Sequence, residues 1–133
     1  MRCGYTDDDD DPLALGRWRS QVNSAMRGKR GQKFFADLIA ALDALPQPRL
    51  IRNDLQSAEG EFCALGALGK ARGVDISELD TEDYEELGQT FNIAHQLAQE
   101  TMYVNDEQVS RRASPEERWA AVRLWAQREL VTP

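Results

Sequence analysis

The sequence Glu61-Phe62-Cys63-Ala64-Leu65-Gly66-Ala67-Leu68-Gly69 places a cysteine where a short strand is expected to turn into a helix of small residues. We expect this helix over residues 64–72, with Gly73 as its C-terminal stop, because glycine readily adopts the left-handed conformation that ends many helices. Gly66 and Gly69 lie three residues apart on one face, and they weaken the helix unless something packs close against them. The stretch therefore predicts a short helix with a tightly packed glycine face.

The chain just before this helix predicts one small β-hairpin. Residues 49–56 and 61–64 have strand-like content, and the turn signal Ser57-Ala58-Glu59-Gly60 separates them. The other elements are predicted to be helices.

Apolar side chains recur at helical spacing along most of the chain. The expected helices before the C-terminal one cover residues 13–27, residues 32–45, residues 64–72 and a short stretch at 84–91. A further helix is capped by Asn92 and runs through Leu97 to Val104, with Asn105-Asp106 as its exit turn. The break at Gly28-Lys29-Arg30-Gly31 makes the first two either one kinked helix or a helical hairpin.

The C-terminal helix has the strongest start signal in the chain. Ser114-Pro115-Glu116-Glu117 is a capping box with proline at the first helical position. A core stripe then follows, made of Trp119, Val122, Ala126 and Leu130. Trp125 flanks this stripe, so we expect it to be partly exposed and to be an interface anchor.

The fold class that follows is mainly α (α+β): a single-domain helical bundle of about six helices with one small β-hairpin, over residues 12–133. Residues 1–11 contain five successive aspartates and almost nothing apolar. Such a segment cannot repay the entropy of ordering, so we expect a disordered acidic tail.

Composition narrows the class of protein. The chain has 133 residues, of which 41% are hydrophobic, enough for one modest core. No window approaches the ~20 apolar residues of a membrane span, and Asp7 to Asp11 stands where a signal peptide would need its apolar stretch. We therefore expect a cytoplasmic protein with no membrane partner, in which Cys3 and Cys63 are reduced thiols.

Charge is divided along the chain. The net charge of −7 argues against direct nucleic-acid binding. Every charge between Pro12 and Ala36 is positive, and every charge from Val74 to Ser110 is negative. These blocks would attract each other within the fold, pair protomers in a homodimer, face two different partners, or form two solvated faces. The negative block consists of Asp75, Glu78, Asp80, Glu82, Asp83, Glu85, Glu86, Glu100, Asp106 and Glu107.

Cys63 is the one candidate for nucleophilic chemistry. A helix N-terminus favours a thiolate, but a nucleophilic cysteine usually needs a base, and His95 is the only histidine. Phe62 and Ala64 flank Cys63, which favours a small buried side chain instead. One histidine and two distant cysteines do not make a zinc site, so we expect neither a metal nor a cofactor.

The turn Gly28-Lys29-Arg30-Gly31-Gln32-Lys33 is a candidate anion site. It precedes a helix, where free backbone N–H groups and basic side chains hold anions. Arg27, Lys29, Arg30 and Lys33 would supply the charge. The turn lacks the Ser or Thr of a nucleotide P-loop, and a plain basic turn between helices is the alternative.

Three segments form a recognisable layout: Cys63-Ala64-Leu65-Gly66-Ala67, then Asn105-Asp106 about forty residues on, then Ser114-Pro115-Glu116-Glu117-Arg118-Trp119. This layout resembles that of small uncharacterised proteins of bacteria and their phages. Residues 17–32 are similar to the N-terminal part of a subset of them, and the resemblance spans most of residues 17–125. It implies no activity, so no catalytic residue is carried over. It implies a phage or prophage setting, in which small acidic proteins are often inhibitors of host defence, anti-CRISPR proteins among them; that role is inferred by analogy alone.

The function we expect is protein–protein binding. The acidic surface within residues 75–107 would occupy a basic nucleic-acid channel of a host or phage protein complex by imitating phosphates. We expect the contact residues to be Asp75, Glu78, Asp80, Glu82, Asp83, Glu85, Glu86 and Trp125. The alternatives are a small cysteine-dependent enzyme that uses Cys63 and nucleic-acid contact through the basic 17–33 face.

Overall fold

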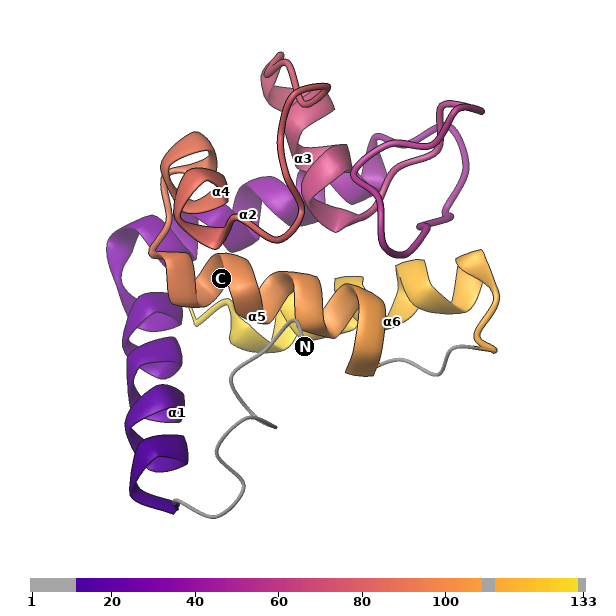
Figure 1. Cartoon of the computed structure of the whole chain (residues 1–133). Coiled ribbons are helices and arrows are strands. Elements are labelled where there is room, and N and C mark those ends of the chain that lie inside the picture. Colours follow the sequence, from indigo (N-terminus) through magenta and orange to yellow (C-terminus); the bar gives the residue numbers. More distant parts are fainter. Residues whose placement is uncertain (1–11, 109–111, 132–133) are drawn as a thin grey trace.

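Helices dominate the structure, a computed structural model that describes residues 12–108 and 112–131 (Figure 1). The elements are α1 (Pro12–Arg27), α2 (Lys29–Asp43), α3 (Ala64–Arg72), α4 (Tyr84–Phe91), α5 (His95–Tyr103), the π-helical turn η1 (Val104–Gln108) and α6 (Pro115–Glu129). The prediction of a mainly helical bundle is confirmed. Among the described residues, no helix combines the length and the apolar character that crossing a bilayer requires. The predicted acidic tail at residues 1–11 lies outside the described part.

The predicted β-hairpin is reduced to one isolated bridge and a few separate backbone hydrogen bonds, such as that from the N–H of Ile51 to the carbonyl of Phe62 at 2.9 Å. In the described part of the chain, no strand forms, and one isolated antiparallel bridge joins Gln56 to Phe62. Two N–H groups before the bridge bond to other elements: Leu50 donates to the carbonyl of Pro115 at 3.0 Å, and Asn53 donates to Asp106 Oδ1 at 3.0 Å. Asn53 also has φ 75°, outside the extended region that a strand requires, so the ladder does not continue.

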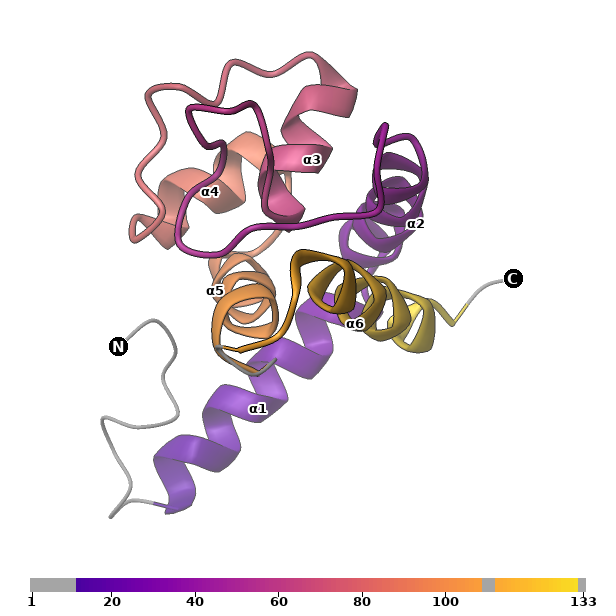
Figure 2. The ribbon, with the colours of Figure 1, turned by 90° about the vertical axis from the view of Figure 1, so that its right-hand side faces the viewer.

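The helices pack in a crossed arrangement. α2 lies against both α3 and α6, α4 packs on α5, and α1 contacts α2 and α5. Figures 1 and 2 show the N-terminal half of α1 extending beyond the other helices. The buried apolar side chains form one cluster, whose largest fully buried members include Phe34, Phe35, Leu38, Leu65, Leu68, Leu87, Phe91, Leu97 and Met102.

Two glycines allow the close packing around α3. A Cβ atom added to Gly66 would lie 1.8 Å from the carbonyl oxygen of Leu55, and one added to Gly69 would lie 2.5 Å from Cγ2 of Ile76. Neither distance is possible for a real Cβ, so any larger residue would push away the segment that packs there. The expectation that something packs close against these glycines is confirmed.

Two predicted helix starts are wrong. α2 begins at Lys29, three residues earlier than expected, because Gly28 alone separates it from α1. Asn92 does not cap the start of the following helix. It ends α4 in the left-handed conformation with φ 57°, which asparagine tolerates better than most residues, and Ala94 precedes α5 without a side-chain cap.

The capping box of α6 is confirmed. The N–H of Glu117 donates to Ser114 Oγ at 3.0 Å, and the N–H of Ser114 donates to Glu117 Oε1 at 2.7 Å. Val122 and Ala126 are fully buried, as the stripe predicts. Trp119 is only half-buried; its indole N–H donates to the carbonyl of Leu42 at 3.0 Å.

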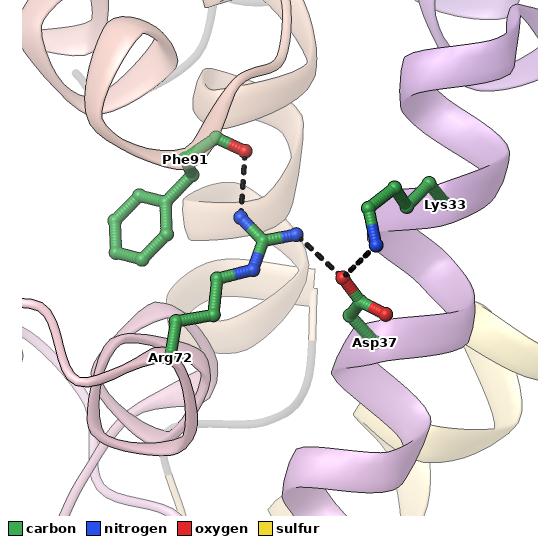
Figure 3. A network of polar contacts seen from close by, with 4 residues as sticks. All are labelled: Lys33, Asp37, Arg72 and Phe91. Atoms are coloured by element: carbon green, nitrogen blue, oxygen red, sulfur yellow. Dashed lines mark hydrogen bonds and ion pairs between the residues drawn. The ribbon is translucent and has the colours of Figure 1, made fainter.

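A polar network ties three helices together (Figure 3). Arg72 at the end of α3 donates to the carbonyl of Phe91 at the end of α4, at 2.9 Å, and to Asp37 Oδ2 on α2, also at 2.9 Å. Lys33 donates to the same carboxylate oxygen at 3.2 Å. The two cations hold the pKa of Asp37 below its ordinary value even though partial burial acts to raise it. Arg72 thereby fixes α4 and α2 relative to α3.

A fully buried asparagine in η1 joins segments that are far apart in the sequence. Asn105 Oδ1 accepts from the N–H of Ala64 at 3.0 Å, and its amide group donates to the carbonyl of Ile51 at 2.9 Å and to Asp106 Oδ1 at 2.7 Å. Arg118 of α6, also buried, donates to the Asn105 carbonyl. Residues from three other parts of the chain therefore depend on Asn105.

We expect Asn105→Ala to lower the free energy of unfolding by about 3 kcal/mol, because it leaves two buried backbone groups, the Ala64 N–H and the Ile51 carbonyl, without their partner. Ser114→Ala is the reference variant, since it removes an exposed cap and is expected to cost about 1 kcal/mol. Urea denaturation of both variants measures the two effects. Equal losses would show that the Asn105 contacts contribute no more than a surface cap.

Candidate functional site

Seven exposed carboxylates lie on the loop between α3 and α4 and on the first turn of α4. This acidic surface consists of Asp75, Glu78, Asp80, Glu82, Asp83, Glu85 and Glu86. Its seven negative charges equal the net charge of −7, so the other acidic residues and the 16 Lys and Arg residues cancel. The surface therefore places seven of the 23 Asp and Glu residues within twelve consecutive positions.

The loop is held by apolar contacts beneath it. Ile76 is buried against Gly69 of α3, and Leu79 packs partly on the core. The N–H of Val74 donates to the carbonyl of Gly69 at 2.9 Å, which fixes the first residues of the loop to the end of α3. The carboxylates are thus carried by a segment with its own attachment to the core.

Three of the seven carboxylates also shape the backbone. Asp75 Oδ1 accepts from the N–H of Ser77 at 3.0 Å and from its hydroxyl at 2.7 Å, and these bonds lower the pKa of Asp75. Asp80 accepts from the N–H of Glu82 at 2.9 Å, and Asp83 caps α4 by accepting from the N–H of Glu86 at 3.1 Å. Glu78, Glu85 and Glu86 are exposed and make no such bond with their side chains among the described residues.

Most of this surface has no compensating positive charge. Within residues 12–108 and 112–131, no Lys or Arg forms an ion pair with Asp75, Glu78, Asp80, Asp83, Glu85 or Glu86. Ionised carboxylates without cationic neighbours create a negative potential that attracts basic groups. The arrangement suits contact with a basic surface on another molecule.

The acidic surface is smaller than the sequence predicts. Glu100 is 5% exposed and Asp106 is fully buried, so neither can contribute to a surface that runs to residue 107. Glu100 on α5 pairs with Arg19 on α1 at 3.1 Å. The two charge blocks therefore do meet within the fold, at this ion pair. Burial raises the pKa of Glu100, against the opposing effect of Arg19.

The basic turn is partly occupied by contacts within the protein. Lys33 binds Asp37, and Arg30 donates to Asn92 Oδ1 at 3.5 Å. Arg27 and Lys29 are exposed. Gln32 from the same turn donates to the carbonyls of Met26 at 2.8 Å and Glu129 at 2.9 Å, and it accepts from the N–H of Val131 at 2.8 Å. This turn therefore anchors the end of α6.

Cys63 lies at the start of α3, as predicted, but it is completely buried. Its Sγ accepts from the N–H of Gly66 at 3.5 Å and caps the helix. Burial raises the pKa of the thiol to about 12, outweighing the backbone N–H groups that lower it. His95 is exposed at the start of α5, where it lines a hollow with Arg30 and Glu85. The complete burial of Cys63 favours a neutral, inert thiol.

Trp125 is half-buried, and a contact within the protein accounts for its position. Its ring meets Phe35 edge to face, with the centroids 5.1 Å apart. Among the described residues, no cluster of three or more His, Cys, Asp or Glu side chains has an arrangement that could hold a metal ion.

Sequence reasoning missed the polar contacts around η1. The sequence predicts an exit turn at Asn105 and Asp106, and it gives no role to Arg118, which follows the capping box. These residues lie in two of the three segments of the sequence layout described above, and Ala64 lies in the remaining one; the structure brings the segments together through Asn105, Ala64 and Arg118. Their presence in that layout was a signal that could have found them.

The raised pKa of Glu100 gives a pH test. Between the ordinary carboxyl pKa of 4.5 and the raised native value, the native state binds more protons than the unfolded state. The stability that Glu100 contributes is therefore greatest at acid pH and declines as pH rises through its native pKa. Relative to Glu100→Gln, the wild type should lose unfolding free energy from about pH 4 to about pH 7. Denaturation at both pH values measures this, and an unchanged difference would contradict it.

Burial of Cys63 makes its thiol unreactive in the native state. In a Cys3→Ser background, which leaves one thiol, a water-soluble disulfide reagent should label the native protein at least about 100-fold more slowly than the denatured protein. Absorbance of the released thiolate follows the reaction. Native labelling at the denatured rate would show an accessible thiolate and would favour the cysteine-dependent enzyme.

Comparison of the chain with models of protein families, with curated protein sequences and with solved structures found no match.

Proposed function

We propose that this protein is a protein-binding module whose acidic surface docks on a basic, nucleic-acid-binding site of a partner complex. The observation that carries the proposal is the set of exposed carboxylates between residues 75 and 86, six of which pair with no Lys or Arg in the described part of the chain. Carboxylates fixed on a surface replace phosphates at sites that bind through charge.

The setting we propose follows from the sequence resemblance. A phage or prophage accessory protein that acts in the cytoplasm would meet host complexes whose channels bind nucleic acid, including defence complexes. An acidic protein held in such a channel excludes the nucleic acid and inhibits the complex. The rest of the molecule carries no net positive charge, which is consistent with a role that opposes nucleic acid and does not bind it.

The structure decides which acidic residues are suitable for a test. Asp75, Asp80 and Asp83 accept backbone N–H groups, so changing them would disturb the loop as well as its charge. Glu78 and Glu85 are exposed and hold no other group of the described chain. Glu59 and Glu107 are equally exposed and lie outside the acidic surface.

Immobilised wild-type protein should retain, from a host lysate, proteins that an excess of duplex DNA displaces. Glu78→Lys/Glu85→Lys should retain about tenfold less of them, because the reversal removes charge complementarity. Glu59→Lys/Glu107→Lys, with the same change in net charge, should behave as wild type. Mass spectrometry of the proteins that DNA elutes measures the retention by the wild type and by each of the two variants. Equal retention by both variants, or nothing that DNA displaces from the wild type, would refute the proposal.

A further inference from the structure

A groove runs between the turn at residues 54–60 and the loop at residues 74–81. Two hollows of about 420 and about 510 Å³ form it. Gln56, Ile76 and Ser77 line both hollows, so the two adjoin at these residues, and we refer to them together as the groove. Figure 2 shows the two chain segments next to each other beside α3 and α4.

The lining of the larger hollow is mostly polar and includes a few apolar side chains. Leu55 and Ile76 line it although both are largely buried, and Leu79 is half-buried there. Long basic side chains combine an aliphatic stem with a charged end, and they bind where an apolar surface lies next to carboxylates. The hollow offers this combination.

The charges around the groove differ between its two ends. Asp54 from the turn and Asp80 from the loop line the larger hollow from its two walls; both are exposed, and no described Lys or Arg forms an ion pair with either. The smaller hollow is lined by Asp75 and Lys70, and Lys70 Nζ lies 5.1 Å from the centroid of the Phe62 ring. One end of the groove is therefore acidic, and the other contains a cation over an aromatic ring.

We propose that the groove binds an extended segment of the partner, with an arginine side chain in the hollow between Asp54 and Asp80 and apolar residues at the Lys70 end. This inference rests on the proposed function, and it names the part of the basic partner that the surface recognises. A guanidinium group in the hollow meets carboxylates from both chain segments, and its aliphatic stem lies along the apolar part of the lining, where Leu79 is half-buried. Lys70 repels a second basic residue at the other end, which sets the direction of the segment.

The probe is a fluorescein-labelled peptide of sequence Arg-Ala-Arg-Ala-Leu-Ala-Leu, whose dissociation constant is measured by fluorescence anisotropy. Asp54→Asn/Asp80→Asn should raise the dissociation constant at least about tenfold, because both carboxylates of the hollow lose their charge. Asparagine at position 80 keeps an oxygen for the N–H of Glu82. Glu78→Gln/Glu85→Gln removes the same charge outside the groove and should raise the constant only about twofold.

Ala58→Trp tests the shape of the groove without changing its charge. Ala58 is exposed and lines the larger hollow, so an indole there fills the space without entering the core. We expect at least about a tenfold rise in the dissociation constant. Wild-type affinity in this variant, or equal losses in the two charge-neutralised variants, would overturn the groove while leaving the acidic surface as the docking site. Failure of the wild type to bind the peptide would overturn the groove as well, and the DNA-displacement experiment would then decide the proposed function independently.

Discussion

The buried amide of Asn105 is the contact on which the arrangement of the other elements depends. It bonds the N–H of Ala64 at the start of α3, the carbonyl of Ile51 in the preceding loop, and the neighbouring carboxylate of Asp106. Arg118 adds α6 by donating to the Asn105 backbone. A buried polar side chain is tolerated only when its groups are paired, so these segments can meet in one geometry alone.

That geometry determines where the acidic surface lies. Fixing the start of α3 fixes its two glycines, and Gly69 receives Ile76 from the loop. Arg72 at the far end of α3 holds the end of α4 and pairs with α2. The loop between α3 and α4 is thus attached at both ends and at its centre, and this is why its carboxylates occupy defined positions although they repel one another.

Local signals in the sequence predicted most of the helices but few of the contacts between them. The capping box at Ser114 and the stop at Gly73 act within a few residues, so their patterns are readable from one segment. No ladder forms at the predicted hairpin because Asn53 leaves the extended conformation and its N–H bonds to Asp106, more than fifty positions away. The same limit applies to the acidic surface. Its seven residues are predicted from their charge alone. The burial of Glu100 and Asp106 depends on tertiary packing, which the order of charges along the chain does not show.

The acidic surface is costly to the fold that carries it. Like charges placed close together destabilise a compact chain, and a surface selected for solubility alone usually mixes both signs. Here three of the basic residues on α1 and α2 make other contacts: Arg19 pairs with Glu100, Lys33 pairs with Asp37, and Arg30 bonds Asn92. The loop instead relies on Ile76, Leu79 and the turns made by its own aspartates. The protein maintains this charge by apolar anchoring and does not neutralise it, which supports the proposal that the surface meets a positive charge on another molecule.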